Sequence, residues 1–203
     1  IENNITKYVP QPGFMNLREA AADKFRVENG IAVSPEQVVV SYGAKHALYN
    51  LFQVYLKPGD EVIVFSPHWM AYPDQVIYAH GVPVYVRAGE EMRYQPDVNA
   101  VRDALTKKTK AMIINSPTNP TGAVYSRDVL EDLAALACEH DLLVVSDEVY
   151  EKILFDGTVH HSVASLNGGI AGRSVTINSV SKTHAMTGWR VGYGAYPLEI
   201  AEK

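Results

Sequence analysis

Lys182 is the residue of this sequence best placed to act as a nucleophile. It lies among small hydroxyl residues, shortly after residues 174–177, whose β-branched side chains are typical of a buried strand. Open α/β sheets bind ligands at the carboxyl ends of their strands. A lysine at such a place attacks carbonyl groups and forms a Schiff base when burial or a nearby cation favours its neutral amine. The alternative interpretation is a solvated lysine in a loop rich in Ser and Thr.

Other side chains that can do chemistry also follow predicted strands. Gly43, Ala44 and Lys45 begin a predicted helix, whose free backbone N–H groups can bind an anion. Six further residues stand after other strands or before the last one: Trp69, Asn119, Asp147, Tyr150, Ser179 and Arg190. Because parallel strands end at the same edge of a sheet, we expect these groups to gather on one rim.

The periodicity of apolar residues predicts the elements that position these groups. Runs rich in Val, Ile and Leu predict strands at residues 37–42, 61–65, 82–86, 111–115, 142–146, 174–177 and 191–194. Helical spacing predicts helices at residues 16–29, 43–55, about 69–79, 98–105 and 129–137, the first capped by Asn16 and ended by Gly30. Continuous apolar strands alternating with helices indicate an α/β fold, with a mostly parallel seven-stranded sheet and helices on both faces.

Composition limits the classes of partner. A net charge of −5 argues against nucleic acid or an anionic membrane as the main ligand. No stretch approaches the roughly 18 apolar residues of a membrane span, so we expect no membrane insertion. The single cysteine, Cys138, lies in an apolar helical run and is interpreted as a core residue. One cysteine permits no intrachain disulfide, which favours a reducing, cytoplasmic location.

The histidines do not suggest a metal site. His140, His160 and His161 lack the spacing of zinc ligands and have no cysteine nearby. We interpret them as loop or surface residues and expect no metal.

The two ends of the sequence are unlike those of a complete protein. The chain has no initiator Met, and it stops near Ile200 inside what looks like a new helix. We interpret it as an internal piece of a longer polypeptide, with residues 1–15 as an N-terminal arm and residues 16–203 as one large domain.

Four short motifs resemble those of a known enzyme family. They are Asn119-Pro120-Thr121-Gly122, Ser146-Asp147-Glu148-Val149-Tyr150, Ser179-Val180-Ser181-Lys182 and Gly188-Trp189-Arg190. In this order they are similar to the successive motifs of class I aminotransferases, fold-type-I enzymes that depend on pyridoxal 5′-phosphate (PLP). The resemblance implies that residues 16–203 are the large PLP-binding domain. It also implies that the C-terminal small domain, with the arginine that binds the substrate α-carboxylate, is absent from this sequence.

The resemblance assigns catalytic roles to three motifs. It makes Lys182 the lysine that forms the Schiff base with PLP and moves the Cα proton. Asp147 would pair with the ring nitrogen of PLP, which must stay protonated if the ring is to accept electrons. Asn119 and Tyr150 would bind the 3′-oxygen of the ring. Taken alone, Asp147 also suits a cap for the turn that follows it.

The resemblance likewise assigns binding roles. Trp69 would stack on the PLP ring, although an ordinary core aromatic is the alternative. The phosphate would be bound by Gly43, Ala44, Lys45, Ser179 and Arg190; alone, Ser179 would be a loop hydroxyl and Arg190 half of a surface ion pair. Tyr8 is similar to the family tyrosine that reaches the phosphate of the neighbouring subunit, which implies a homodimer with shared active sites.

The implied activity is transfer of an amino group between an L-amino acid and a 2-oxo acid. The segment around Lys45 resembles the bacterial aspartate aminotransferases, where a lysine at this position binds the distal carboxylate of aspartate or glutamate. Trp69 and Asn119 would also contact the substrate. Ala44 and His68 depart from that branch, where Gly and Tyr are common, and leave the amino-acid preference open.

Two other functional classes remain open. A different fold-type-I PLP enzyme, such as a carbon–sulfur lyase, would share the cofactor residues and differ in its substrate contacts. A non-catalytic, aminotransferase-like regulatory domain would be expected to carry a DNA-binding segment, and none is recognisable in these residues.

Overall fold

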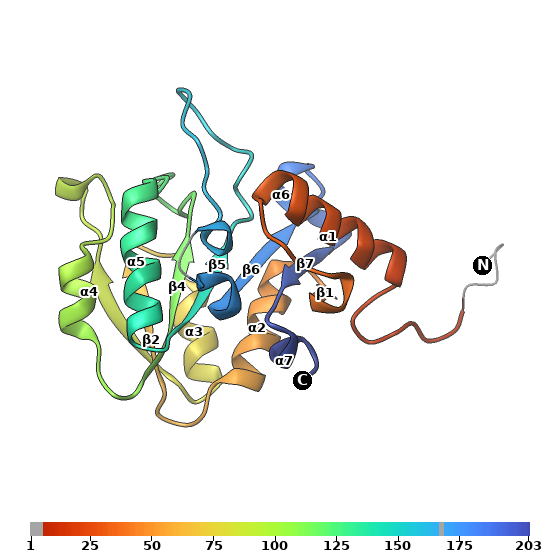
Figure 1. Cartoon of the computed structure of the whole chain (residues 1–203), viewed down its shortest axis with the longest axis horizontal. Helices are drawn as coiled ribbons and strands as arrows, with labels where there is room; N and C mark the ends of the chain where they lie inside the picture. The colour runs from red at the N-terminus through yellow and green to blue at the C-terminus, as the bar shows by residue number, and fades with distance from the viewer. Residues whose placement is uncertain (1–5, 167–168) are drawn as a thin grey trace.

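The computed structural model describes residues 6–166 and 169–203, so the first five residues of the predicted arm lie outside the described residues (Figure 1). The described chain forms one seven-stranded sheet with helices packed on it. Its strands are β1 (Val38–Ser41), β2 (Glu61–Ser66), β3 (Val82–Arg87), β4 (Thr109–Asn115), β5 (Leu143–Asp147), β6 (Ser174–Ser179) and β7 (Gly192–Ala195). All seven predicted strands are therefore confirmed, with ends that differ by one or two residues.

The strand order explains how distant residues reach one edge of the sheet. The order is β1-β7-β6-β5-β4-β2-β3. Strands β3, β2, β4, β5 and β6 are parallel, whereas β7 is antiparallel to both of its neighbours, β6 and β1. The prediction of a mostly parallel sheet is confirmed. Because β7 alone is reversed, its amino end lies where all the other strands have their carboxyl ends.

The five helices predicted before and between the strands are present, and the structure adds the short helix α6 (Val180–Thr183). The other helices are α1 (Met15–Asn29), α2 (Ala44–Tyr55), α3 (Ala71–Tyr78), α4 (Val98–Ala104), α5 (Arg127–Glu139) and α7 (Leu198–Ala201). Short 3-10 helices complete the chain: η1 (Pro35–Gln37), η2 (Glu90–Met92), η3 (Val163–Ser165), η4 (Ile170–Arg173) and η5 (Thr187–Trp189). Within the described residues, no helix combines the length and the apolar character needed to cross a membrane.

The ends of α1 test the predicted caps. The prediction that Asn16 caps this helix is wrong, because α1 begins at Met15 and its N-cap is the extended residue Phe14. The Phe14 carbonyl accepts the first helical hydrogen bonds, while the Asn16 side chain accepts a bond from the next residue of the chain. Gly30 ends the helix with a φ of 68°, as its lack of a Cβ allows.

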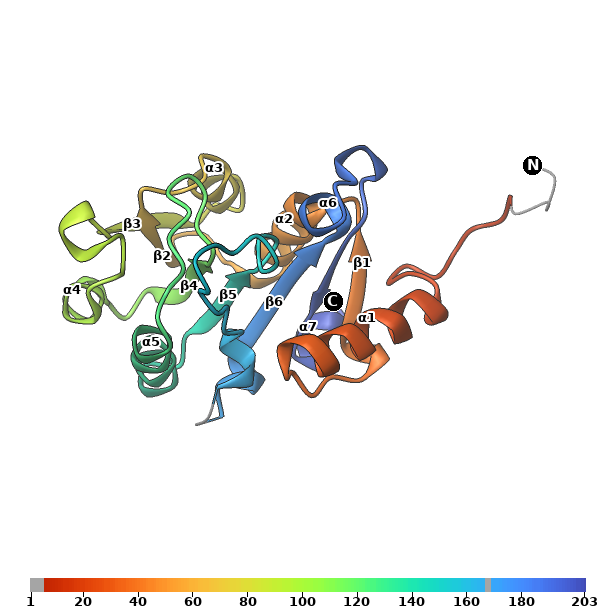
Figure 2. The same ribbon diagram turned by 90° about the horizontal axis from the view of Figure 1, so that it is seen from above.

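Helices cover both faces of the sheet, as predicted (Figure 2). Successive residues of each central strand point to opposite faces, so that Val64 packs against α2 and α3 while Ile63 packs against α4 and α5. Helix α1 lies on the same side as α5 and buries Phe25 against β1 and β7. Cys138 is partly buried and packs against the cluster under α5. The predicted core position of this cysteine is thus at the margin of the core.

Candidate active site at the carboxyl ends of the strands

A pocket of about 290 Å³ lies at the sheet edge where the parallel strands end. Its lining residues are Ala44, Lys45, Trp69, Tyr72, Asn119, Asp147, Val149, Tyr150, Ser179, Ser181, Lys182, Thr187 and Arg190. These include every site residue predicted from the sequence except Gly43 and Tyr8. Arg190 reaches the pocket because it precedes the reversed strand β7.

Lys182 lies on α6, directly beyond the carboxyl end of β6 (Figure 2). The helix is capped by Ser179, whose hydroxyl accepts a hydrogen bond of 3.2 Å from the backbone N–H of Ser181. Lys182 is exposed, and its Nζ lies 5.4 Å from the centroid of the Tyr150 ring. Among residues 6–166 and 169–203, no salt bridge involves Lys182. The amine therefore lies beside a phenol in the pocket, and no carboxylate of the described residues forms a salt bridge with it.

Asp147 is a buried carboxylate at the end of β5. Only 3% of the residue is exposed, and burial raises the pKa of its carboxyl from 3.8 to about 6. Hydrogen bonds from the Tyr72 hydroxyl and from the Val149 backbone N–H oppose that rise, at donor–acceptor distances of 2.8 and 3.4 Å. No cation pairs with this carboxylate among the residues described. A buried carboxylate without a cation is costly, so this site favours a positively charged ligand group.

Tyr72 is a pocket residue that the sequence interpretation missed. Its hydroxyl donates to Asp147 Oδ2, and its ring meets the ring of Trp69 edge-on, with centroids 5.4 Å apart. Burial raises the pKa of the Tyr72 hydroxyl well above its ordinary value, so the group remains a hydrogen-bond donor at neutral pH. The signal was its position three residues after Trp69 in the helix predicted from about residue 69, because that spacing places two side chains on one face of a helix; α3 itself begins only at Ala71.

An anion-binding corner forms where Gly43 meets Arg190. Gly43 has a φ of 87° and precedes the first residue of α2, whose backbone N–H groups are free at that end. The Arg190 guanidinium donates to two backbone carbonyls, Nη2 to Tyr42 at 3.2 Å and Nη1 to Thr187 at 2.9 Å. These partners are neutral, and no carboxylate pairs with Arg190 in the described chain. Its charge therefore remains available for an anion.

A Cβ on Gly43 would lie 2.3 Å from Arg190 Nη2, so only glycine leaves the guanidinium in this place. Because Gly43 directly precedes α2, its close contact with Arg190 also keeps the guanidinium beside the free N-terminal end of that helix. Ser179 lines the same pocket as Arg190 and is 2% exposed. Of the five residues predicted to bind a phosphate, all except Gly43 line this one pocket.

One side of the pocket is formed by the aromatic ring of Trp69, with the Lys45 ammonium beside it. Trp69 is partly buried, and Lys45 Nζ lies 5.4 Å from its ring centroid, within the range of a cation–π contact.

Asn119 is held in its turn by Asn115, whose side-chain oxygen accepts a 2.8 Å hydrogen bond from the Asn119 backbone N–H. The Asn115 amide in turn donates to the backbone carbonyl of Asp147 at 3.0 Å. The ends of β4 and β5 are tied together by this bridge.

Tyr8 lies away from the pocket. It is fully exposed, in the arm that leads away from the sheet before α1 (Figures 1 and 2). The predicted role of Tyr8 concerns a second subunit, so this single chain does not test it.

Behind the pocket, Glu148 and its neighbours form a buried polar cluster. Glu148 is 1% exposed and accepts hydrogen bonds from the hydroxyls of Ser146 and Ser162, at 2.8 and 2.5 Å. His160 Nε2 lies 3.0 Å from a carboxylate oxygen of Glu148, and the imidazole is only 9% exposed. The sequence interpretation of His160 is a loop or surface residue; it does lie in a loop, but its side chain is largely buried rather than at the surface. Its loop folds under the strand end, which sequence spacing does not reveal.

The same cluster joins the strand end to α1. Glu151 is 4% exposed, pairs with Lys24, and accepts a 2.6 Å hydrogen bond from the Asn29 amide. Ligand atoms of Glu148, Glu151 and His160 lie within 4.8 Å of one another. The Lys24 ammonium already compensates negative charge there, so the arrangement is that of an internal ion-pair cluster. It holds the turn that carries Asp147 and Tyr150 from the face opposite the pocket.

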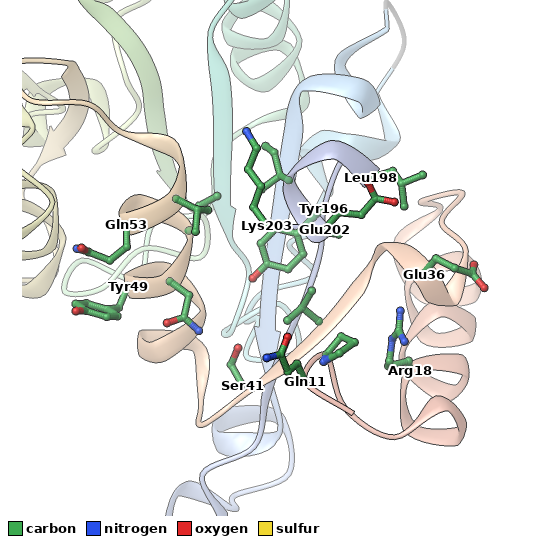
Figure 3. Close-up of a pocket in the computed structure, with 17 residues that line it drawn as sticks. Gln11, Arg18, Glu36, Ser41, Tyr49, Gln53, Tyr196, Leu198, Glu202 and Lys203 are labelled. Carbon is green, nitrogen blue, oxygen red and sulfur yellow. The ribbon is translucent and has the colours of Figure 1, made fainter. Parts of the chain in front are cut away.

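A larger cavity, of about 590 Å³, lies elsewhere, between α1, α2 and the C-terminal segment. Figure 3 shows Tyr49 and Gln53 projecting from α2 on one side, Arg18 from α1 on the other, and Tyr196 between them. None of the predicted site residues lines this cavity. Size alone therefore does not identify the reactive site.

Comparison with known proteins places the chain in a family. The chain belongs to the aminotransferase class I and II family, whose model matches residues 1–203. The family predicted from the four motifs is therefore confirmed.

Individual relatives agree with this assignment. The chain is 48% identical to an aspartate aminotransferase of Bacillus sp. (strain YM-2), over 98% of this chain and 51% of the relative. It is 52% identical to the aspartate/prephenate aminotransferase of Thermus thermophilus, over 96% of this chain and 50% of the relative. The solved Thermus thermophilus aspartate aminotransferase with maleate superposes with a TM-score of 0.95 at 50% identity, covering 99% of this chain and 52% of that one. The chain thus spans about half the length of the relatives it matches.

Proposed function

We propose that this chain is the cofactor-binding part of a PLP-dependent aminotransferase, which moves an amino group between aspartate or glutamate and a 2-oxo acid. One observation carries the proposal. A single pocket combines the Lys182 amine, the buried carboxylate of Asp147 and the cationic corner at Arg190. Half of a relative's length is present here, so the activity is proposed for the whole protein.

The residues of the pocket fit PLP at three separate points. Asp147 lacks a cation in the described chain, and a protonated ring nitrogen would provide one. The Arg190 guanidinium and the free end of α2 suit a phosphate dianion. The Lys182 amine suits an aldehyde. When bound, PLP supplies an electrophilic carbonyl and an electron-withdrawing ring.

The protein's own groups would then bind, orient and move protons. Lys182 Nζ, free of a carboxylate partner among described residues, would act as the general base that takes the substrate Cα proton and returns it. Tyr150 and Asn119 would orient the ring by hydrogen bonds to its 3′-oxygen. Trp69 would cover one face of the ring and shield it from water.

Substrate choice is proposed from Lys45 and from the relatives. Lys45 is exposed at the pocket, with its ammonium near the Trp69 ring, and it would bind the distal carboxylate of a dicarboxylic substrate. Relatives named as aspartate aminotransferases support this preference. A solved aromatic aminotransferase of Pyrococcus horikoshii, 44% identical with a TM-score of 0.95, shows that the same fold occurs with a differently named activity. Substrate comparison is therefore part of the test.

Replacement of Lys182 tests the enzyme assignment. Borohydride reduction in the presence of PLP should attach the cofactor irreversibly to Lys182, as peptide mapping would reveal. Lys182→Ala should lose this attachment and nearly all aminotransferase turnover. Lys107→Ala, an exposed lysine away from the pocket, is the matched control and should retain both. Turnover close to wild type in the Lys182→Ala protein would overturn the assignment.

We also propose that the protein works as a cytoplasmic homodimer with residues 1–15 as an arm to the partner. Exposed side chains before α2 and at the two ends of α3 support a second copy: Tyr42 at 77%, Met70 at 75% and Tyr78 at 68%. The rings of Tyr42, His46, Tyr49 and Tyr78 form a chain of contacts with centroids 5.4, 6.5 and 5.8 Å apart.

Tyr8, fully exposed on the arm, would reach the partner's phosphate site. Sedimentation should give a dimer mass, and Tyr8→Phe should weaken PLP binding without changing that mass. A monomer with full PLP affinity would contradict the shared site.

A further inference from the structure

We propose that Tyr72 is a positioning residue of this site: its hydroxyl holds the Asp147 carboxylate in place and keeps it ionised for the cofactor. The inference rests on the proposed function and goes beyond it, because it gives a role to a residue of α3 that neither the four motifs nor the strand-end rule identifies.

The hydrogen bond between Tyr72 and Asp147 is buried and involves only one of the two carboxylate oxygens. Tyr72 and Asp147 are each 3% exposed, and the hydroxyl lies 2.8 Å from Oδ2. Within the described part of the chain, Oδ1 accepts only the long 3.4 Å bond from the Val149 backbone N–H. One carboxylate oxygen is therefore committed to Tyr72, and the other remains available to a ligand. A carboxylate held by one strong bond is fixed in rotation, which orients its second oxygen.

The electrostatic surroundings make this donor matter. Burial is the largest influence on the Asp147 carboxyl and the nearby Glu148 acts in the same direction, so that the net pKa is raised to about 6. The hydrogen bonds from Tyr72 and from Val149 N–H act in the opposite direction. Tyr150, at the pocket, and Tyr125, behind it, also influence the Tyr72 hydroxyl and both favour its protonated form. Tyr72 therefore stays a donor over the working pH range.

Loss of the hydroxyl has a definite consequence. Without it, Asp147 would be protonated over a wider range of pH, and a neutral carboxylic acid cannot compensate a protonated ring nitrogen. PLP should then bind less tightly near neutral pH. At higher pH the carboxyl ionises even without Tyr72, so the difference from wild type should shrink.

The same ring serves a second contact. Tyr72 packs edge-on against Trp69, with ring centroids 5.4 Å apart. Tyr72→Phe keeps this packing and removes a single oxygen atom, so it separates the hydrogen bond from the support of Trp69. Tyr196→Phe is the matched control, because Tyr196 is also buried, at 6% exposure, and lines the separate large cavity.

The first experiment titrates the Asp147 carboxyl in the cofactor-free protein by carbon-13 NMR, with Asp147→Asn identifying the signal. The midpoint should rise by about one pH unit in Tyr72→Phe, the usual scale for a lost charge-assisted hydrogen bond, and should not move in Tyr196→Phe. An unchanged titration midpoint in Tyr72→Phe would overturn the proposal. The titration is made on the cofactor-free protein and does not depend on enzyme activity.

The second experiment measures PLP affinity from pH 6 to pH 9. Tyr72→Phe should bind about ten-fold more weakly at the acid end, with the gap closing as the pH rises. A gap that is constant with pH would indicate lost packing and would overturn the electrostatic role. If the wild-type protein fails to bind PLP at any pH, the proposed function fails, while the titration still decides whether Tyr72 keeps Asp147 ionised.

Discussion

Replacement of Gly192 by alanine should destabilise the protein and disturb the anion-binding end of α2. Gly192 begins β7 and pairs with Ser41 of β1. A Cβ at this position would lie 2.3 Å from the carbonyl carbon of Gly43 and 2.5 Å from the backbone nitrogen of Ala44. Both contacts are with backbone atoms, which cannot rotate away as a side chain would. The start of α2 must therefore move away from β7.

The structure sets the scale of this effect. Contacts of a Cβ below 3.0 Å essentially do not occur, so both backbones must shift. Overpacking of this kind costs about 1–3 kcal/mol, and a weakened backbone hydrogen bond between β1 and β7 adds about 1 kcal/mol. We expect a loss of about 2–4 kcal/mol in the free energy of unfolding. Because the moving atoms belong to Gly43 and Ala44, binding of PLP or inorganic phosphate should weaken as well.

Urea unfolding of the cofactor-free protein measures the loss. Gly172→Ala is the matched control, since a Cβ there would meet nothing within 4 Å and its φ lies outside the left-handed region. The control should stay within about 0.5 kcal/mol of wild type or become slightly more stable. If Gly192→Ala proved as stable as Gly172→Ala, the close approach of β7 to α2 described here would be refuted.

Three further predictions concern charged residues. Lys24→Met should lower the free energy of unfolding by about 3–5 kcal/mol in urea, because the buried Glu151 loses its cation, whereas Arg26→Met breaks only an exposed pair and should be nearly neutral. The folded carboxyl of Asp147 has its pKa raised from 3.8 to about 6, so it binds its proton more tightly than the unfolded chain does, and the stability of the cofactor-free protein should fall as pH rises through that interval. Melting curves across pH should show that Asp147→Asn lacks this fall and gains up to about 3 kcal/mol at pH 7; an unchanged pH profile would contradict the assignment. Lys45→Ala should raise KM for aspartate and glutamate, by about 1.5–3 kcal/mol in binding, and leave KM for phenylalanine nearly unaltered; equal losses for all substrates would make Lys45 a phosphate-binding or structural residue.

The sequence by itself determined the class of fold and the edge at which chemistry gathers. Val144 and Val145 belong to an uninterrupted apolar strand, and such a strand is stable only when helices cover both faces of its sheet. Polar residues directly after strands of this kind, such as Asp147 and Asn119, must therefore lie at one rim. Local periodicity carries this information because it follows from the geometry of each element taken alone.

Local pattern was less informative about the ends of elements. Asn16 is a good capping residue by type, yet Phe14 starts α1, because the path of the arm before the helix decides which carbonyl accepts the first bonds. A cap prediction from residue type ignores that path.

Only the tertiary structure decided which groups meet across elements. Tyr72 and Asp147 are distant in the chain, and their hydrogen bond depends on how α3 packs against β2 and β3 so that Tyr72 reaches the end of β5. The neighbours Asp147 and Glu148 look alike in sequence, but one accepts a bond from Tyr72 at the pocket and the other joins His160 in the buried cluster behind it. Arg190 reaches the pocket because β7 is reversed. Contacts of this kind depend on packing and strand direction between separate elements, which the periodicity of each element does not contain.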